Sequence, residues 1–127
     1  MAETTLTNYF REKLALYFYN GSSLPRGTQI ALGDGGYDSV GEEVIVADAA
    51  QTSLNNVLLT KDITSLSHPT AYSVTAIGTV LPTELIGESI SEVGLLDSTG
   101  GLIGVRNFAP KIKDNDETYD FEITLNF

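Results

Sequence analysis

The sequence predicts an α+β domain in which an N-terminal helix packs on a mainly antiparallel β-sheet or sandwich. Three stretches carry this prediction. Residues 6–20 hold apolar side chains at helical spacing, residues 90–108 have the pattern of a β-hairpin, and residues 119–127 alternate between apolar and polar side chains. With 127 residues the chain has the length of one domain, so we expect a single unit over 1–127 with its sheet-forming region at about 71–127.

The N-terminal helix is expected at about residues 6–20. Its apolar side chains lie on one helical face, at Leu6, Phe10, Leu14, Tyr17 and Phe18. Thr7 or Asn8 can cap the start, and Asn20-Gly21 supplies the left-handed residue that is common at helix ends. An aromatic stripe of this kind is more often core than a partner-binding face, so we expect it to pack on the chain's own sheet.

The middle of the chain is expected to hold short strands and irregular connections. Thr28–Leu32 and Val44–Ala47 are apolar strand candidates. Leu54–Leu58 has helical spacing but polar neighbours, so we expect one or two helical turns at most, followed by extended chain. His68 precedes Pro69, which favours extended backbone, and we expect this histidine in a loop.

The strongest strand signals come next. Ala71–Leu81 is a long strand whose apolar phase changes after Gly78, which suggests a bulge there. Ile90–Leu96 and Leu102–Phe108 are apolar runs joined by turn formers, and they lack clean alternation. Both faces of this hairpin should therefore be covered, and it should be central in its sheet. Because consecutive antiparallel strands tend to be neighbours, we expect these three strands and residues 119–127 to be contiguous.

No set of side chains indicates catalysis, so we expect no enzyme, no cofactor and no metal. Asp34, Asp38, Glu42 and Glu43 could suggest calcium, but their spacing is not that of an EF-hand. The glycines beside them are followed by no lysine that would mark a phosphate loop. His68 is the only histidine and there is no cysteine, so neither a zinc site nor a hydrolytic triad can be assembled. Paired carboxylates that could act on sugars are expected by chance among 17 acids.

Composition narrows the classes of partner. The formal charge is −10, and no Lys or Arg lies between Gly27 and Thr60, so we expect no nucleic-acid partner. We expect no membrane partner either, because no apolar run approaches the roughly 18 residues of a membrane span. The N-terminus lacks the pattern of a secretory signal, and the absence of cysteine fits a reducing cytosol.

Four segments, in this order, resemble the N-terminal domains of phage tail-collar fibre proteins: Leu6-Thr7-Asn8, Ile30 to Gly36, Glu84 to Gly87 and Glu92 to Phe108. The resemblance implies a phage or prophage tail structural protein whose domain attaches a fibre or collar to the baseplate. Its partners would be other tail or baseplate proteins. It would reside in the host cytoplasm during assembly and then in the tail of the virion. Family members usually continue into a shaft and a host-binding tip, so receptor binding is not carried over.

Two loops are the candidate docking surfaces, because binding residues often lie on loops held by a rigid scaffold. One is the polar loop 33–43, with Gly33, Asp34, Gly35, Gly36, Tyr37 and Asp38; the other is the hairpin tip, with Asp97, Ser98, Thr99, Gly100 and Gly101. Both could equally be plain connections. A surface this acidic should meet a basic patch, and its association should slow as salt rises.

Self-association and an alternative function complete the expectations. Fibres of the resembled family are commonly trimers, but this chain has no coiled-coil seam, so we expect self-association to be weak or dependent on the baseplate. The alternative function is a small carbohydrate-binding adhesion module that uses Tyr37 as its platform.

Overall fold

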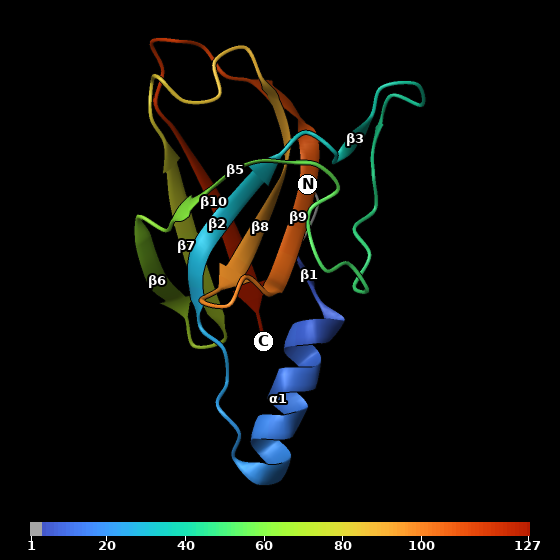
Figure 1. The fold of residues 1–127 in the computed structure, drawn as a ribbon, viewed down its shortest axis with the longest axis vertical. Coiled ribbons are helices and arrows are strands. Elements are labelled where there is room, and N and C mark those ends of the chain that lie inside the picture. Colours follow the sequence, from blue (N-terminus) through green and yellow to red (C-terminus); the bar gives the residue numbers. More distant parts are fainter. Residues whose placement is uncertain (1–3) are drawn as a thin grey trace.

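The computed structural model of the chain describes residues 4–127. The first three residues of the expected 1–127 unit, on which part of the argument against a secretory signal rests, lie outside it. Two antiparallel sheets pack against each other, and one helix extends from one end of them (Figure 1). The fold class predicted from the sequence is therefore confirmed.

The larger sheet is built around the predicted hairpin. It has five strands in the order β1 (Thr5–Leu6), β9 (Leu102–Ile112), β8 (Ser89–Asp97), β2 (Gly27–Gly33) and β5 (Val57–Asp62). Strand β8 is the central strand, as expected of the hairpin. Strand β9 pairs with β8 on one side and only with the two residues of β1 on the other. The hairpin turn between β8 and β9 contains Gly100 at φ 87°, a left-handed conformation that favours glycine.

The second sheet has three strands in the order β10 (Tyr119–Asn126), β7 (Ser73–Val80) and β6 (Ser65–Thr70). A separate two-stranded ribbon, β3 (Tyr37–Asp38) with β4 (Glu43–Val44), projects to one side (Figure 1). His68 lies in the exposed edge strand β6, so its expected place in a loop is wrong, although its extended backbone is as Pro69 favours. The expected helical turns at Leu54–Leu58 are also wrong, because β5 begins at Val57.

The core lies between the two sheets. It joins side chains of the larger sheet to side chains of the smaller one: Ile30, Leu32, Ile90, Val93, Leu95 and Ile103 with Ala76, Val80, Phe121, Ile123 and Leu125. A second cluster covers the outer face of the larger sheet, where Leu54 packs with Ala31, Leu102 and Val105. Both faces of the hairpin are thus buried, which explains why its strands lack alternation.

The expected contiguity of the last four strands is wrong, because they divide between the sheets. Strand β7 pairs with β10, from Ser73 opposite Asn126 to Val80 opposite Tyr119, and neither pairs with the hairpin. The β7–β10 register shows no bulge at Gly78. Gly78 instead faces the other sheet, where a Cβ would lie 2.2 Å from Cγ2 of Ile30. The glycine interrupts the apolar pattern because the sheets approach closely there, not because the strand changes phase.

Helix α1 (Asn8–Asn20) has the predicted caps. Thr7 Oγ1 accepts a hydrogen bond from the backbone N–H of Phe10, and Gly21 ends the helix at φ 73°, its N–H donating to Tyr17 O. The same Thr7 hydroxyl bonds to the carbonyl of Leu102 in β9. The helix is therefore joined to the sheet at its first turn.

Beyond that turn the expectation that the apolar stripe packs on the sheet is wrong. Phe10 is buried, but Leu14, Tyr17 and Phe18 are 37%, 50% and 89% exposed. Figure 1 shows the reason: α1 points away from the end of the sheets, so that most of its length runs past them.

Candidate docking site

The glycine loop after β2 is fastened to the sheet by one carboxylate. Glu92 lies in the middle of β8 and is completely buried. Its oxygens accept hydrogen bonds from the backbone N–H groups of Gly35 at 2.8 Å, Asn55 at 2.8 Å and Asn56 at 2.9 Å. A buried carboxylate needs such donors, and three of them also tie two separate loops to one strand.

The glycines of this loop are required by close packing. A Cβ at Gly33 would lie 2.2 Å from Asn56 O, one at Gly35 would lie 2.5 Å from Asn55 Cβ, and one at Gly36 would lie 2.1 Å from Ser91 O. Gly33 and Gly36 are buried, while Asp34 is exposed. The first half of the predicted docking loop therefore faces inward, against β8 and the segment before β5.

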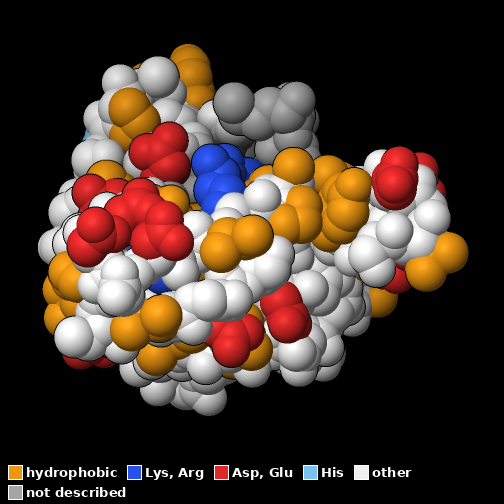
Figure 2. Space-filling view, turned by 90° about the horizontal axis from the view of Figure 1, so that it is seen from above, with side chains coloured by type: hydrophobic (Ala, Val, Ile, Leu, Met, Phe, Trp, Pro, Cys, Tyr) orange, Lys and Arg blue, Asp and Glu red, His pale blue; other side chains and the backbone are white. Residues whose placement is uncertain are grey.

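The second half of the loop forms a projecting element, residues 37–46, which we call the arm. Its strands pair Tyr37 with Val44, and its base is held by a hydrogen bond from Asn107 Nδ2 to Ile45 O at 2.8 Å. Val40 and Val46 are 93% and 89% exposed. Three acids accompany them, Asp38, Glu42 and Glu43, and all are exposed. In Figure 2 the arm forms the lobe at the right of the molecule, with red and orange side chains together on it.

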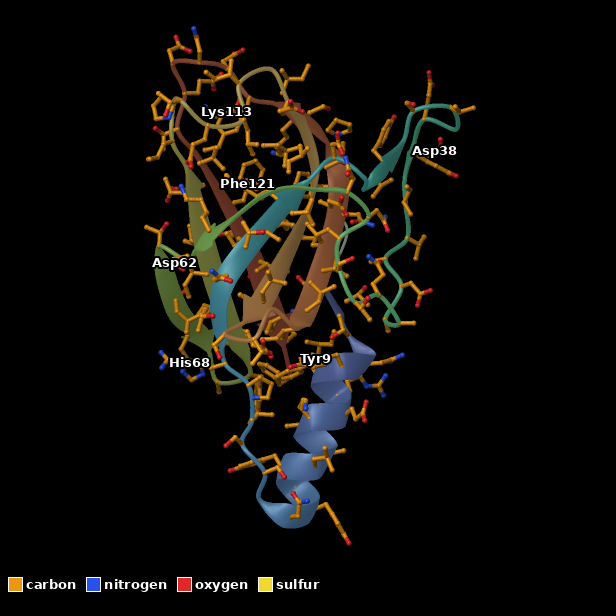
Figure 3. The ribbon with its side chains drawn as sticks, viewed as in Figure 1. Tyr9, Asp38, Asp62, His68, Lys113 and Phe121 are labelled. Carbon is orange, nitrogen blue, oxygen red and sulfur yellow. The ribbon has the colours of Figure 1, made fainter. Side chains whose placement is uncertain are left out.

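The predicted hairpin tip also has an inward side. Asp97 is buried and accepts hydrogen bonds from Tyr9 Oη at 2.6 Å, from both Oγ1 and N–H of Thr99, and from Gly101 N–H. Burial alone would raise the pKa of Asp97, but these hydrogen bonds outweigh it and hold the pKa below its usual value. Tyr9 lies where α1 meets the sheets (Figure 3). Ser98, Thr99 and Gly100 are exposed, and a Cβ at Gly101 would lie 2.4 Å from the Tyr9 ring.

The four acids considered for calcium do not converge. An oxygen of Asp34 is taken by the Asn56 amide, and Asp38 Oδ1 accepts from the N–H of Val40 in its own turn. Within residues 4–127, three acidic oxygens come within 4.8 Å of one another only at Asp114, Asp116 and Glu117, on an exposed turn. Hydrogen bonding to Asp114 raises the pKa of Glu117, as expected where carboxyl groups crowd.

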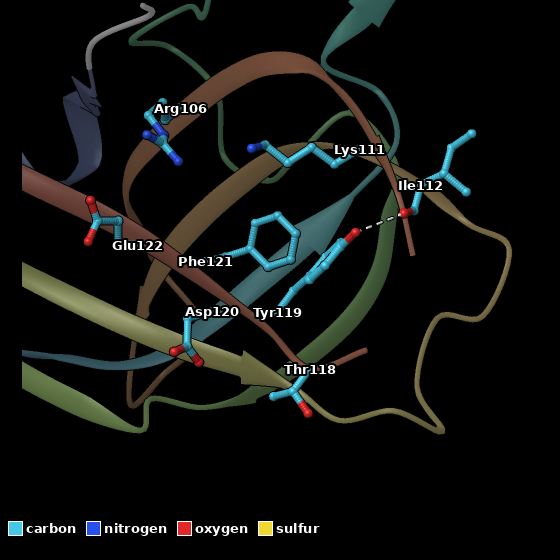
Figure 4. A pocket seen from close by; sticks show the side chains of 8 residues that line it. All are labelled: Arg106, Lys111, Ile112, Thr118, Tyr119, Asp120, Phe121 and Glu122. Carbon is cyan, nitrogen blue, oxygen red and sulfur yellow. Dashed lines mark hydrogen bonds between the residues drawn. The ribbon is translucent and has the colours of Figure 1, made fainter. Parts of the chain in front are cut away.

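A hollow of about 690 Å³ opens between β9 and β10 (Figure 4). Arg106 and Lys111 line one side, while Asp120 and Glu122 line the other, so its charges largely cancel. The Arg106 guanidinium lies 5.2 Å from the centre of the Phe108 ring, and Tyr119 donates to Ile112 O at 3.3 Å. This arrangement has neither a nucleophile–base pair nor the positive field that a phosphate backbone requires.

Sequence reasoning found the arm and the hairpin tip but missed Glu92. One signal was available: an acid in the middle of an apolar run whose two faces were both expected to be covered must have buried partners. The carbohydrate alternative gains no support from Tyr37, because this residue is only partly exposed in β3.

Comparison with known proteins gives one match. The model of the family described as phage tail-collar fibre protein, N-terminal, matches residues 1–125. No curated protein and no solved structure matches. Within residues 4–127 no helix is long and apolar enough to cross a membrane. Since the family model spans nearly the whole chain, the chain belongs to the phage tail-collar fibre protein family, in the region that forms the N-terminal domain.

Proposed function

We propose that this domain attaches a tail fibre or collar to the baseplate of a phage or prophage tail, and that the arm is its docking element. Family membership over residues 1–125 is the observation that carries the proposal, since a fibre protein acts with other tail proteins in the virion. The role is structural, without catalysis and without nucleic-acid or membrane partners. The protein is made in the host cytoplasm and works in the assembled tail as a homotrimer.

The arm supports docking through its shape and its anchorage. It projects from the body, which makes it accessible to a neighbouring subunit, yet its base is fixed to β9 through Asn107 and to β8 through the glycine loop. A surface element held on a rigid scaffold loses little conformational freedom on binding. The exposed tip of the hairpin, residues 98–100, is a second candidate contact.

The chemistry of the arm defines the partner surface. Val40 needs an apolar recess, and Asp38, Glu42 and Glu43 around it need basic groups. A tail protein with a shallow apolar depression ringed by Lys or Arg fits both demands. The attraction between exposed charges is screened by salt, so docking should weaken as ionic strength rises.

The experiment is capture of tail and baseplate proteins, encoded beside the gene, by the tagged full chain at low and high salt. The test variant is Glu42→Lys/Glu43→Lys. The control, Glu88→Lys/Asp116→Lys, changes the net charge equally at two other exposed acids. We expect the arm variant to lose capture and the control to retain it.

Two results would overturn the proposal. One is a chain that captures no tail protein under any of these conditions. The other is equal loss in both variants, which would assign the effect to net charge and not to the arm.

A further inference from the structure

We propose that the projecting half of α1 is a self-association surface, on which α1 helices from further copies of this chain pack. The inference deepens the proposed trimer by naming its interface, and it does not depend on the baseplate. The expectation of weak self-association rested on the absence of a coiled-coil seam. The apolar stripe of α1 did not enter it, because that stripe was expected to pack on the sheet, whereas the structure leaves most of the stripe exposed.

The free half of α1 is apolar on all sides. From Leu14 to Tyr19 every side chain is apolar, and at 100° per residue these six positions are spread round the whole helix. Five of them are large and exposed: Leu14 37%, Leu16 39%, Tyr17 50%, Phe18 89% and Tyr19 86%. A helix that is apolar all round is normally buried on every side. A single flat partner would cover one side only, whereas a cluster of helices gives each member more than one neighbour.

The exposed area is sufficient for an interface. Taking about 150–250 Å² for a whole aromatic side chain, these residues expose roughly 600 Å² of apolar surface per chain. This is at the top of the range for a patch on a monomer, and close to the roughly 800 Å² that each partner buries in a standard interface.

The apolar surface continues past the helix. A cavity of about 330 Å³ lies at the base of α1, lined by Phe10, Leu24, Leu125 and Phe127 among others. Leu24 and Phe127 are 37% and 59% exposed. The cavity is a recess in which a large side chain from a neighbouring copy can be buried.

Charge favours another copy over a different protein. No charged residue occurs from Leu14 to Pro25, although the whole chain carries −10. Two copies of so acidic a chain repel each other wherever their bodies meet, and the uncharged helix projects away from the bodies. A distinct partner would be expected to exploit charge, as the arm does, and this surface offers none.

The test measures the mass of the full chain by sedimentation equilibrium from about 1 to 100 µM, a range that brackets micromolar association. The helix variants are Phe18→Glu/Tyr19→Glu and the uncharged Phe18→Ser/Tyr19→Ser. The matched control is Val40→Glu/Val46→Glu, which places the same two charges at equally exposed positions on the arm. Far-UV circular dichroism should be nearly unchanged in all variants, because these side chains are exposed in the single chain and make few contacts within it.

We expect an oligomer whose dissociation constant rises at least tenfold in both helix variants and stays within about twofold in the control. Added salt should leave self-association unchanged or strengthen it, because salt screens the repulsion between acidic copies. The same salt should weaken docking through the arm, because it screens the attraction between opposite charges. A chain that is monomeric throughout this range, or an oligomer indifferent to the helix variants, would overturn the inference. Failure of tail-protein capture with an intact oligomer would contradict only the proposed docking function.

Discussion

Replacing Glu92 by alanine is the most demanding test of how the arm is held. The substitution removes the acceptor of the N–H groups of Gly35, Asn55 and Asn56, all within 2.8–2.9 Å of its oxygens. A buried donor left without a partner costs about 1–3 kcal/mol. Allowing for relaxation and water entry, we expect Glu92→Ala to lower the free energy of unfolding by about 4 kcal/mol, a large part of the 5–15 kcal/mol typical of a domain.

Glu92→Gln separates charge from shape. Glutamine keeps the volume and one acceptor oxygen, but its NH₂ group meets a backbone N–H where the second carboxylate oxygen stood. We therefore expect a loss of about 2 kcal/mol, between wild type and alanine. Glu122→Ala, on the exposed face of β10, is the control and should change stability by no more than about 0.5 kcal/mol.

Urea unfolding followed by circular dichroism measures these changes in the free energy of unfolding. Amide hydrogen exchange shows which parts of the chain lose protection. The amides of Gly35, Asn55 and Asn56 should lose protection first in Glu92→Ala. If that variant is within about 1 kcal/mol of wild type, or if those amides stay protected, Glu92 is not what holds the loops.

Three further outcomes are expected. Thr7→Ala removes the cap of α1 and should lower the melting temperature, by an amount corresponding to about 1–2 kcal/mol; an unchanged transition would contradict the capping role. Gly78→Ala should cost about 1–3 kcal/mol by pressing on Cγ2 of Ile30; because Ile30→Ala removes that atom, the two substitutions together should cost less than the sum of the single ones, and strict additivity would place the strain elsewhere. The pKa of Glu84 is lowered by its hydrogen bond with Lys61, and that of Asp97 is lowered as described above. The ionised carboxylates of Glu84 and Asp97 therefore add to the free energy of unfolding above the unfolded pKa values of about 4, and this stabilisation is lost as the pH falls through the lower folded values. The melting temperature should drop on acidification below about pH 4, and it should drop less steeply in Asp97→Asn.

The parts of the fold that the sequence predicted correctly have local causes. Thr7 and Gly21 mark the ends of α1 through contacts within a few residues, and the glycine-containing turn after β8 makes the hairpin. The absence of alternation in the hairpin strands correctly indicated that both faces are covered.

The parts that failed depend on contacts between distant residues. Nothing near Gly78 in the sequence indicates that Ile30 of the other sheet will touch it, so a packing glycine had the same signature as a bulge. The division of the last four strands between two sheets is likewise a long-range choice, because β7 and β10 are separated by the whole hairpin. The helical stripe correctly predicted a helix, but its spacing carries no information on the direction in which the helix leaves the sheet.

The sequence predicted where in the chain the candidate docking loop lies, but not which of its residues face the protein interior. Glycines with acids between two strands indicated a surface loop, and the arm is such a loop. Which of its residues face inward depends on Glu92, more than fifty positions away in the chain. Of the predicted docking residues, Asp97 and four of the glycines lie against the chain's own atoms: Gly33, Gly35, Gly36 and Gly101. Asp38 and the tip residues 98–100 are exposed.

Strand β8 connects the two projecting elements mechanically. Glu92 near its middle holds the glycine loop from which the arm rises, and Asp97 at its end holds Tyr9 at the base of α1. The two acidic residues are five positions apart in the strand, about 17 Å along the chain, and the strand between them lies in the centre of its sheet. Arm and helix are therefore anchored to one buried strand, so that, under the two proposals above, a partner bound to the arm would have a defined orientation relative to copies joined through α1. Since each anchor is local, loss of Glu92 should loosen the arm while leaving self-association intact, and loss of Asp97 should do the reverse.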